Sequence, residues 1–257
     1  MTQPTAEEMI QGAIRLGMDS LGFSGHAPLG FPNNWAMKNT EAYYAELLQQ
    51  KKRYEGQLSV YLGLEQDYYS PPPPQWCEYL IGSVHLIRVG EQYYPTDYTS
   101  QALMDAANGE FGGDIYSVVE TYYALVGQLP ERTGCQIIGH FDVITKNNER
   151  HPLFDPNHPR YVKAAMDALD ALAEHDLVFE INTGAMSRGY RTTPYPDKFL
   201  LRAMGERNLP ICLSSDAHDA RHLLHGFREA SQWAKSCGYN SCVYWNGKEF
   251  CEDALPD

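Results

Sequence analysis

Six short apolar segments, separated by stretches of helical length, constrain the fold of this chain more than any other feature of its sequence. Each segment runs into a polar side chain, in most cases a histidine or a carboxylate. The intervening stretches carry apolar residues at helical spacing near residues 40–55, 114–129, 159–175, 196–207 and 219–236. This alternation predicts repeated strand–helix units, with strands at residues 20–26, 58–65, 79–85, 136–142, 177–182 and 209–218.

The arrangement of these strands follows from their composition. Strands that are apolar throughout and alternate with helices indicate a parallel sheet that is covered on both faces. Polar residues at the carboxyl ends of many successive strands are typical of the active face of a βα-barrel. An open doubly wound sheet, the alternative, gathers its polar residues at one switch point and usually carries a glycine-rich phosphate loop. Because no such loop motif occurs here, we expect an α/β barrel, with residues 1–257 forming a single domain.

The first helix is signalled by a capping box. Thr5 and Glu8 have the spacing at which the threonine hydroxyl accepts from the first helical turn and the glutamate reaches back. Apolar residues recur on one face after them, and Gly17 is a plausible end. The sequence therefore predicts a helix between Thr5 and Gly17.

Charge and cysteine content restrict the class of partner. Lys and Arg number 20 against 33 Asp and Glu, which gives a formal net charge of −13, so extended nucleic acid and anionic membranes are poor partners. No apolar run reaches the ~18 residues of a spanning helix, and the first residues do not resemble a signal peptide. The six cysteines include no C-x-x-C pair. We expect a soluble, cytoplasmic protein with reduced thiols, for which assembly into a homo-oligomer stays open.

Six polar residues converge on one end of the expected barrel. Imidazole and carboxylate donors without thiolates suit a catalytic site for zinc, manganese or iron. Asp216 and His218 are separated by a single residue near the last strand, so both reach the site only if the chain turns there. We expect a helix that starts near Asp219 to supply that turn. The candidate metal ligands are His26, Glu65, His85, His140, Asp216 and His218.

A cluster of divalent cations favours one kind of chemistry. It lowers the pKa of a bound water and neutralises phosphoryl oxygens during in-line attack, so hydrolysis of a small phosphate ester fits well. Arg188 and Arg191 follow the strand that ends at Asn182 and could counter the substrate's charge. The alternative is that either arginine is an ordinary solvated charge in a loop. A serine nucleophile is the weaker interpretation, because no G-x-S-x-G motif is present.

The ordered set of strand-end motifs resembles that of the polymerase-and-histidinol-phosphatase (PHP) family, and within it the histidinol-phosphatases of histidine biosynthesis. The similar segments span nearly the whole chain, and only as an ordered set are they specific. They are residues 22–28, 63–65, 81–85, 113–116, 138–142, 180–183 and 214–218.

The resemblance implies a (βα)₇ barrel with a trinuclear metal site that hydrolyses L-histidinol phosphate to L-histidinol and phosphate. It implies that Glu65 is the bridging carboxylate and that Glu65, Asp216 and His218 serve catalysis. The implied ligands are His85 and His140 for one metal, His26 and His218 for another, and Asp216 for the third. Arg188 matches the family's basic position near the substrate phosphate.

One part of the family pattern has no counterpart. The family opens with a strand carrying His-x-His and a further ligand histidine, whereas no histidine precedes His26. Either the sequence begins at an internal start or the protein is a degenerate member. With Glu65, His85 and His140 as the complete ligand set, we expect one ion to bind firmly and hydrolysis to be slow. Alternatives are another PHP phosphoesterase, acting on a nucleotide or sugar phosphate, and a non-catalytic metal-binding member.

Overall fold

The structure, a computed structural model, describes residues 4–256 and is built around a six-stranded parallel sheet. The strands lie side by side in the order in which they occur along the chain, so the sheet has no switch point of the doubly wound kind. They are β1 (Ser20–His26), β2 (Ser59–Asp67), β3 (Tyr79–Ser83), β6 (Ile137–Ile138), β7 (Val178–Asn182) and β8 (Ile211–Ser214). The prediction of six parallel strands is confirmed.

The sheet is strongly curled. In a flat sheet the two edge strands, β1 and β8, would be separated by five spacings of ~4.8 Å, or about 24 Å. The ring centroids of His26, at the end of β1, and His218, just beyond β8, are only 6.1 Å apart. Curling therefore brings the carboxyl ends of the first and last strands to the same place, as in a barrel.

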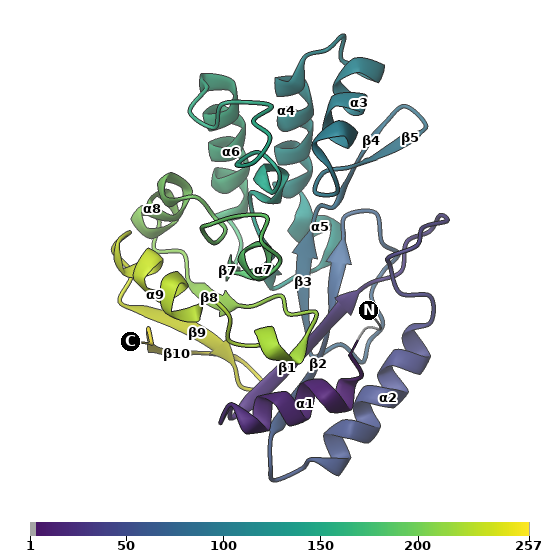
Figure 1. The fold of residues 1–257 in the computed structure, drawn as a ribbon, viewed down its shortest axis with the longest axis vertical. Coiled ribbons are helices and arrows are strands. Elements are labelled where there is room, and N and C mark those ends of the chain that lie inside the picture. The colour runs from purple at the N-terminus through teal and green to yellow at the C-terminus, as the bar shows by residue number, and fades with distance from the viewer. Residues whose placement is uncertain (1–3, 257) are drawn as a thin grey trace.

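Nine helices and two short 3₁₀ helices cover this sheet within residues 4–256. Helices α3, α4 and α6 lie together at one end of the molecule, and α1 and α2 lie at the other (Figure 1). Each predicted helical stretch contains a helix, whereas α3, α5 and α7 were not predicted. The bounds are α1 (Ala6–Arg15), α2 (Thr40–Arg53), α3 (Ser100–Glu110), α4 (Ile115–Val126), α5 (Leu129–Thr133), η1 (Val143–Thr145), α6 (Pro159–Leu172), α7 (Gly184–Ser187), α8 (Lys198–Glu206), η2 (Ala220–His222) and α9 (Phe227–Lys235).

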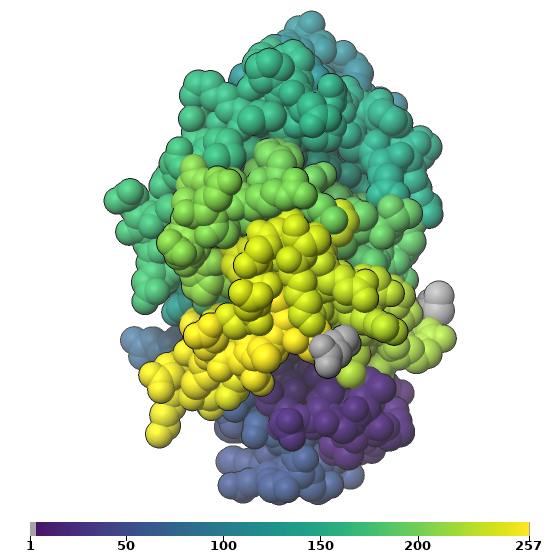
Figure 2. Space-filling model, turned by 90° about the vertical axis from the view of Figure 1, so that its left-hand side faces the viewer, coloured from purple at the N-terminus to yellow at the C-terminus, as the bar shows by residue number. Residues whose placement is uncertain are grey.

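Two antiparallel hairpins, which the sequence did not predict, complete the fold. One is formed by β4 (Leu86–Val89) and β5 (Gln92–Pro95), and the other by β9 (Ser241–Trp245) and β10 (Phe250–Ala254). Side chains of the second hairpin pack in one apolar cluster with Tyr79 of the parallel sheet. Figure 2 shows this C-terminal segment, in yellow, lying across the molecule between the purple N-terminal and the green elements. The hairpin thus covers one end of the curled sheet.

Glycines in the strands make room for bulky interior side chains. A Cβ atom added at Gly63 would lie 2.6 Å from the Tyr79 ring, and one added at Gly22 would lie 2.5 Å from the Tyr79 hydroxyl oxygen. One added at Gly139 would lie 2.6 Å from the hydroxyl oxygen of Ser83. These glycines therefore allow bulky side chains to pack closely against the strands.

The predicted capping box is present at α1. The Thr5 amide donates to Glu8 Oε2 at 2.8 Å, and the Glu8 amide donates to Thr5 Oγ1 at 3.2 Å. The buried face of the helix, which includes Ile10 and Ala13, packs on a cluster that contains residues of β1 and β2. The cap thus fixes the start of a helix that supports the edge of the sheet.

Removing the cap should lower stability modestly. We expect Thr5→Ala to reduce the free energy of unfolding by about 1 kcal/mol, because the Glu8 amide loses its acceptor. Thr5→Ser keeps an acceptor oxygen and should stay within about 0.5 kcal/mol of the parent. Urea denaturation of the three proteins measures both values, and an equal loss in the two variants would contradict the role of the hydroxyl.

None of the helices within residues 4–256 is long and apolar enough to cross a membrane.

Candidate metal centre and active site

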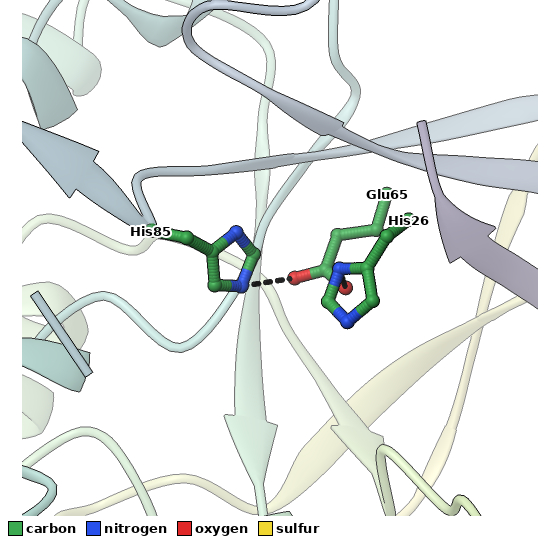
Figure 3. Close-up of side chains that lie close together, drawn as sticks. All are labelled: His26, Glu65 and His85. Carbon is green, nitrogen blue, oxygen red and sulfur yellow. Dashed lines mark ion pairs between the residues drawn. The ribbon is translucent and has the colours of Figure 1, made fainter. Parts of the chain in front are cut away.

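Glu65, near the end of β2, is the centre of the site. Its Oε1 atom lies 3.0 Å from His140 Nε2 and 3.2 Å from His85 Nε2, and it accepts a hydrogen bond from Ser83 Oγ at 2.8 Å. Its Oε2 atom lies 3.0 Å from His26 Nδ1. Figure 3 shows the carboxylate between the rings of His26 and His85. A single buried carboxylate thus gathers three histidines from three different strand ends.

The electrostatics of this group favour ionised Glu65. Burial alone would raise the pKa of Glu65, but His26 and His85 hold it well below its ordinary value. Burial would lower the pKa of His85, yet the carboxylate raises it well above its usual range. The imidazoles around Glu65 thus balance a negative charge that a bound cation can balance instead.

The donor set fits a divalent transition-metal ion. Donor atoms of His26, Glu65 and His85 all lie within 4.8 Å of one another. The ring of His140 is 5.1 Å from that of His85, and its buried Nδ1 atom has no hydrogen-bond partner among the described residues. Imidazole and carboxylate donors are those of catalytic zinc, manganese and iron sites. The expected proximity of His85 and His140 is confirmed.

Two buried carboxylates orient these histidines, and the sequence analysis missed both. Asp67 Oδ2 accepts from the His85 amide at 2.9 Å and lies 3.3 Å from its ring Nδ1. Glu180 Oε2 accepts from the His140 amide at 2.9 Å. Asp67 could have been found, since it stands two residues after Glu65 on one strand and alternate residues share a face. A carboxylate at a ring nitrogen fixes the orientation of a ligand histidine, as Asp67 does for His85, whereas Glu180 holds the backbone of His140.

Removing the support of His85 should weaken metal binding without unfolding the protein. We expect Asp67→Asn to reduce divalent-metal affinity by about tenfold, because outer carboxylates fix and polarise ligand imidazoles. Asp105→Asn, on the exposed face of α3, should leave affinity unchanged. Calorimetric titration with Zn²⁺ or Mn²⁺ makes the comparison, and equal affinity in all three proteins would contradict it.

Asp216 lies at a sharp turn beyond β8. Its φ of 44° places it in the left-handed region, which is uncommon for a residue with a side chain. The chain therefore turns at Asp216 itself, and the expectation of a helix starting near Asp219 is wrong in detail: Asp219 caps the short η2, and α9 begins only at Phe227. The turn still places Asp216 and His218 on the same cavity.

Arg188 is held by Asp216. Its guanidinium donates to Asp216 Oδ2 and to the Asp216 carbonyl oxygen, both at 2.9 Å. A Cβ atom at Gly184 would lie 2.5 Å from Asp216 Oδ2 and 2.9 Å from the Arg188 guanidinium, so the glycine permits this pair. Asp216 thereby holds the guanidinium group of Arg188 at the edge of the site.

Both tautomers of His218 find a hydrogen-bond partner at Nδ1. Its Nδ1 atom lies 3.0 Å from the Asp216 carbonyl oxygen, an acceptor, and 3.1 Å from an Arg188 nitrogen, a donor. A proton on Nδ1 would donate to the carbonyl and leave the Nε2 lone pair free for a cation. The same Asp216 carbonyl oxygen also accepts a hydrogen bond from Arg188.

A cavity of about 220 Å³ joins these groups, and all six predicted metal ligands line it. Two hollows of 630 and 950 Å³ lie elsewhere, but neither is lined by a histidine of the described chain. Arg188 also lines the smaller cavity, together with side chains that the sequence analysis did not single out. These are Asp97, Val143, Lys146, Tyr190 and Tyr195.

The other predicted arginine lies behind the cavity wall. Arg191 is 9% exposed and is absent from the lining residues. Its guanidinium lies 3.9 Å from Asp142 Oδ2, donates to Thr145 Oγ1, and sits 4.5 Å from the ring centroid of Tyr195. Burial raises the pKa of Asp142 to about 6, although Arg191 opposes the shift. Arg191 thus contacts the site through Tyr195, which does line the cavity.

Comparison with known proteins assigns the family. The sequence profile of the PHP domain matches residues 2–184, most of the chain. The chain belongs to the PHP domain family. The identification of the family from the strand-end motifs is thereby confirmed.

Two proteins named as histidinol phosphatases resemble the chain over most of its length. The histidinol-phosphatase of Bacillus subtilis strain 168 is 27% identical over 244 residues, which cover 84% of this chain and 88% of that protein. The crystal structure of histidinol phosphate phosphatase from Lactococcus lactis, complexed with zinc, L-histidinol and phosphate, matches with a TM-score of 0.71 at 18% identity. That match covers 97% of this chain and 94% of the other. It confirms the PHP-type α/β fold.

Proposed function

We propose that this protein is a metal-dependent phosphomonoesterase that hydrolyses L-histidinol phosphate to L-histidinol and phosphate. The observation that carries the proposal is the cluster of His26, His85 and His140 around Glu65, in a cavity that also holds Arg188. The PHP family and the histidinol-phosphatases similar to this chain support the choice of substrate.

In this proposal some side chains bind metal ions and another binds the phosphate. Glu65, His85 and His140 hold one divalent ion, while His26, His218 and Asp216 provide donors for further ions. Bound metal ions supply a hydroxide at neutral pH and neutralise charge on the phosphoryl group. Arg188, fixed by Asp216 at the cavity, donates to a phosphate oxygen of the substrate.

Phosphate release from a panel of phosphomonoesters tests the proposal. The protein, loaded with Mn²⁺ or Zn²⁺, should hydrolyse L-histidinol phosphate with a higher kcat/KM than nucleoside monophosphates or sugar phosphates. Removing the metal with a chelator should abolish release, and adding it back should restore release. Preference for another ester would point to a different PHP phosphoesterase, and no release from any ester would point to a metal-binding member without catalysis.

We extend the proposal to a cytoplasmic location. All six cysteines, each within residues 4–256, are free, and unpaired thiols are typical of reducing compartments. Localisation of a tagged protein by microscopy or fractionation tests this part.

A further inference from the structure

The cavity contains an ion pair that neither the metal ligands nor the proposed hydrolysis uses. Lys146 Nζ lies 2.8 Å from Asp97 Oδ2, and both residues line the cavity. Their side chains are only 14% and 23% exposed. Asp97 is not among the donors gathered around Glu65.

The pair is held in place from both sides. Thr96, which is fully buried, donates from its amide to the His85 carbonyl at 2.9 Å and from its hydroxyl to the Val84 carbonyl at 3.0 Å. Asp97 is therefore fixed next to the histidine cluster by the residue before it. Lys146 follows η1 and lies 5.0 Å from the ring centroid of Tyr190.

The contact with Lys146 favours the ionised form of Asp97. Burial would raise the pKa of Asp97, but Lys146 and His85 lower it below the ordinary value. A negative side chain in a site for phosphomonoester dianions is unfavourable by itself, because like charges repel at short range. A carboxylate there becomes favourable if the ligand carries its own positive group near the phosphate.

We propose that Asp97 and Lys146 separate when a ligand binds, with Asp97 accepting hydrogen bonds from an ammonium group of the ligand and Lys146 donating to its phosphate. The site would thus select phosphomonoesters in which an ammonium group is separated from the ester oxygen by a short carbon spacer. Once they separate, the Asp97 carboxylate and the Lys146 ammonium provide one partner for each of the two opposite charges of such a zwitterion. This inference rests on the proposed function, since L-histidinol phosphate has this charge pattern.

Kinetics on a matched pair of substrates test the inference. The substrates are L-histidinol phosphate and its des-amino analogue, which lacks only the ammonium group. Asp97→Asn should lower kcat/KM for the first by about 10- to 100-fold, the effect of losing a hydrogen bond to a charged group. It should change kcat/KM for the second by less than about threefold.

A second variant and a control complete the series. Lys146→Met should lower kcat/KM for both esters, because both carry the phosphate. Asp167→Asn breaks the exposed Lys163–Asp167 pair on α6 and should affect neither. Equal losses on both esters in Asp97→Asn, or an unchanged kcat/KM for L-histidinol phosphate, would overturn the role of Asp97.

Product binding provides a readout that does not need turnover. In calorimetry with metal and inorganic phosphate present, the parent protein should bind L-histidinol at least about tenfold more tightly than the des-amino alcohol. Asp97→Asn should abolish that difference, and a parent that binds the two alcohols equally would overturn the inference. Failure of the proposed function looks different: the parent would discriminate between the alcohols but prefer another ammonium-bearing ester in the phosphate-release panel.

Discussion

Glu65→Gln should eliminate almost all phosphatase activity and most bound metal. Both carboxylate oxygens are engaged, Oε1 with His85 and His140 and Oε2 with His26. Glutamine keeps the size of the side chain but loses the negative charge, and one of the two acceptors becomes a donor facing an imidazole. Loss of an outer partner of a metal site typically costs about 10- to 100-fold. We therefore expect kcat/KM to fall by at least about 1000-fold when the central carboxylate itself is changed.

The measurement combines phosphate release with elemental analysis of the purified protein. Glu120→Gln is a matched control, because Glu120 of α4 pairs with Arg160 of α6 and lies outside the cavity. It should leave activity and metal content at parental values. Retention of metal and activity in Glu65→Gln would remove Glu65 from the centre of the mechanism.

The six predicted metal ligands could be brought together from the sequence because of one topological rule. The carboxyl ends of neighbouring parallel strands meet at one edge of a sheet, so His26, Glu65 and His85 had to be neighbours once the strands were assigned. The rule does not depend on strand length, which explains why His140 reaches the site although β6 spans only Ile137–Ile138. Local sequence signals were sufficient for the parallel sheet and for this part of the site.

Residues delivered by irregular segments could not be placed in the same way. Asp97 follows the β4–β5 hairpin and Lys146 follows a single 3₁₀ turn, and the position of neither follows from the regular strand–helix alternation. Their pairing depends on how two loops fold over the strand ends. Arg191 shows the converse, since its place near a strand end suggested the cavity, whereas its guanidinium points to buried Asp142. A basic residue in a loop after a strand end can be predicted to lie near the site, but the direction of its side chain cannot be predicted.

Arg188→Ala should weaken phosphate binding and leave the metal content unchanged. Arg188 lines the cavity and is held by two hydrogen bonds to Asp216, so its guanidinium has a fixed position there. Hydrogen bonds to charged groups contribute about 1.5–3 kcal/mol, which predicts a loss in kcat/KM of about 10- to 150-fold. Arg188→Lys keeps the charge without the planar fork and should recover only part of this loss.

Arg221 offers the control for this variant, since it makes a similar ion pair with Asp219 at 2.7 Å but does not line the cavity. Arg221→Ala should therefore leave kcat/KM unchanged. Inorganic phosphate should inhibit Arg188→Ala more weakly than the parent, whereas metal content should be equal in the two proteins. If Arg188→Ala instead lost metal and phosphate affinity together, the arginine would act by positioning Asp216 as a ligand rather than by contacting the substrate. Because the guanidinium contacts both the Asp216 carboxylate and its carbonyl, only the combination of the two readouts separates these roles.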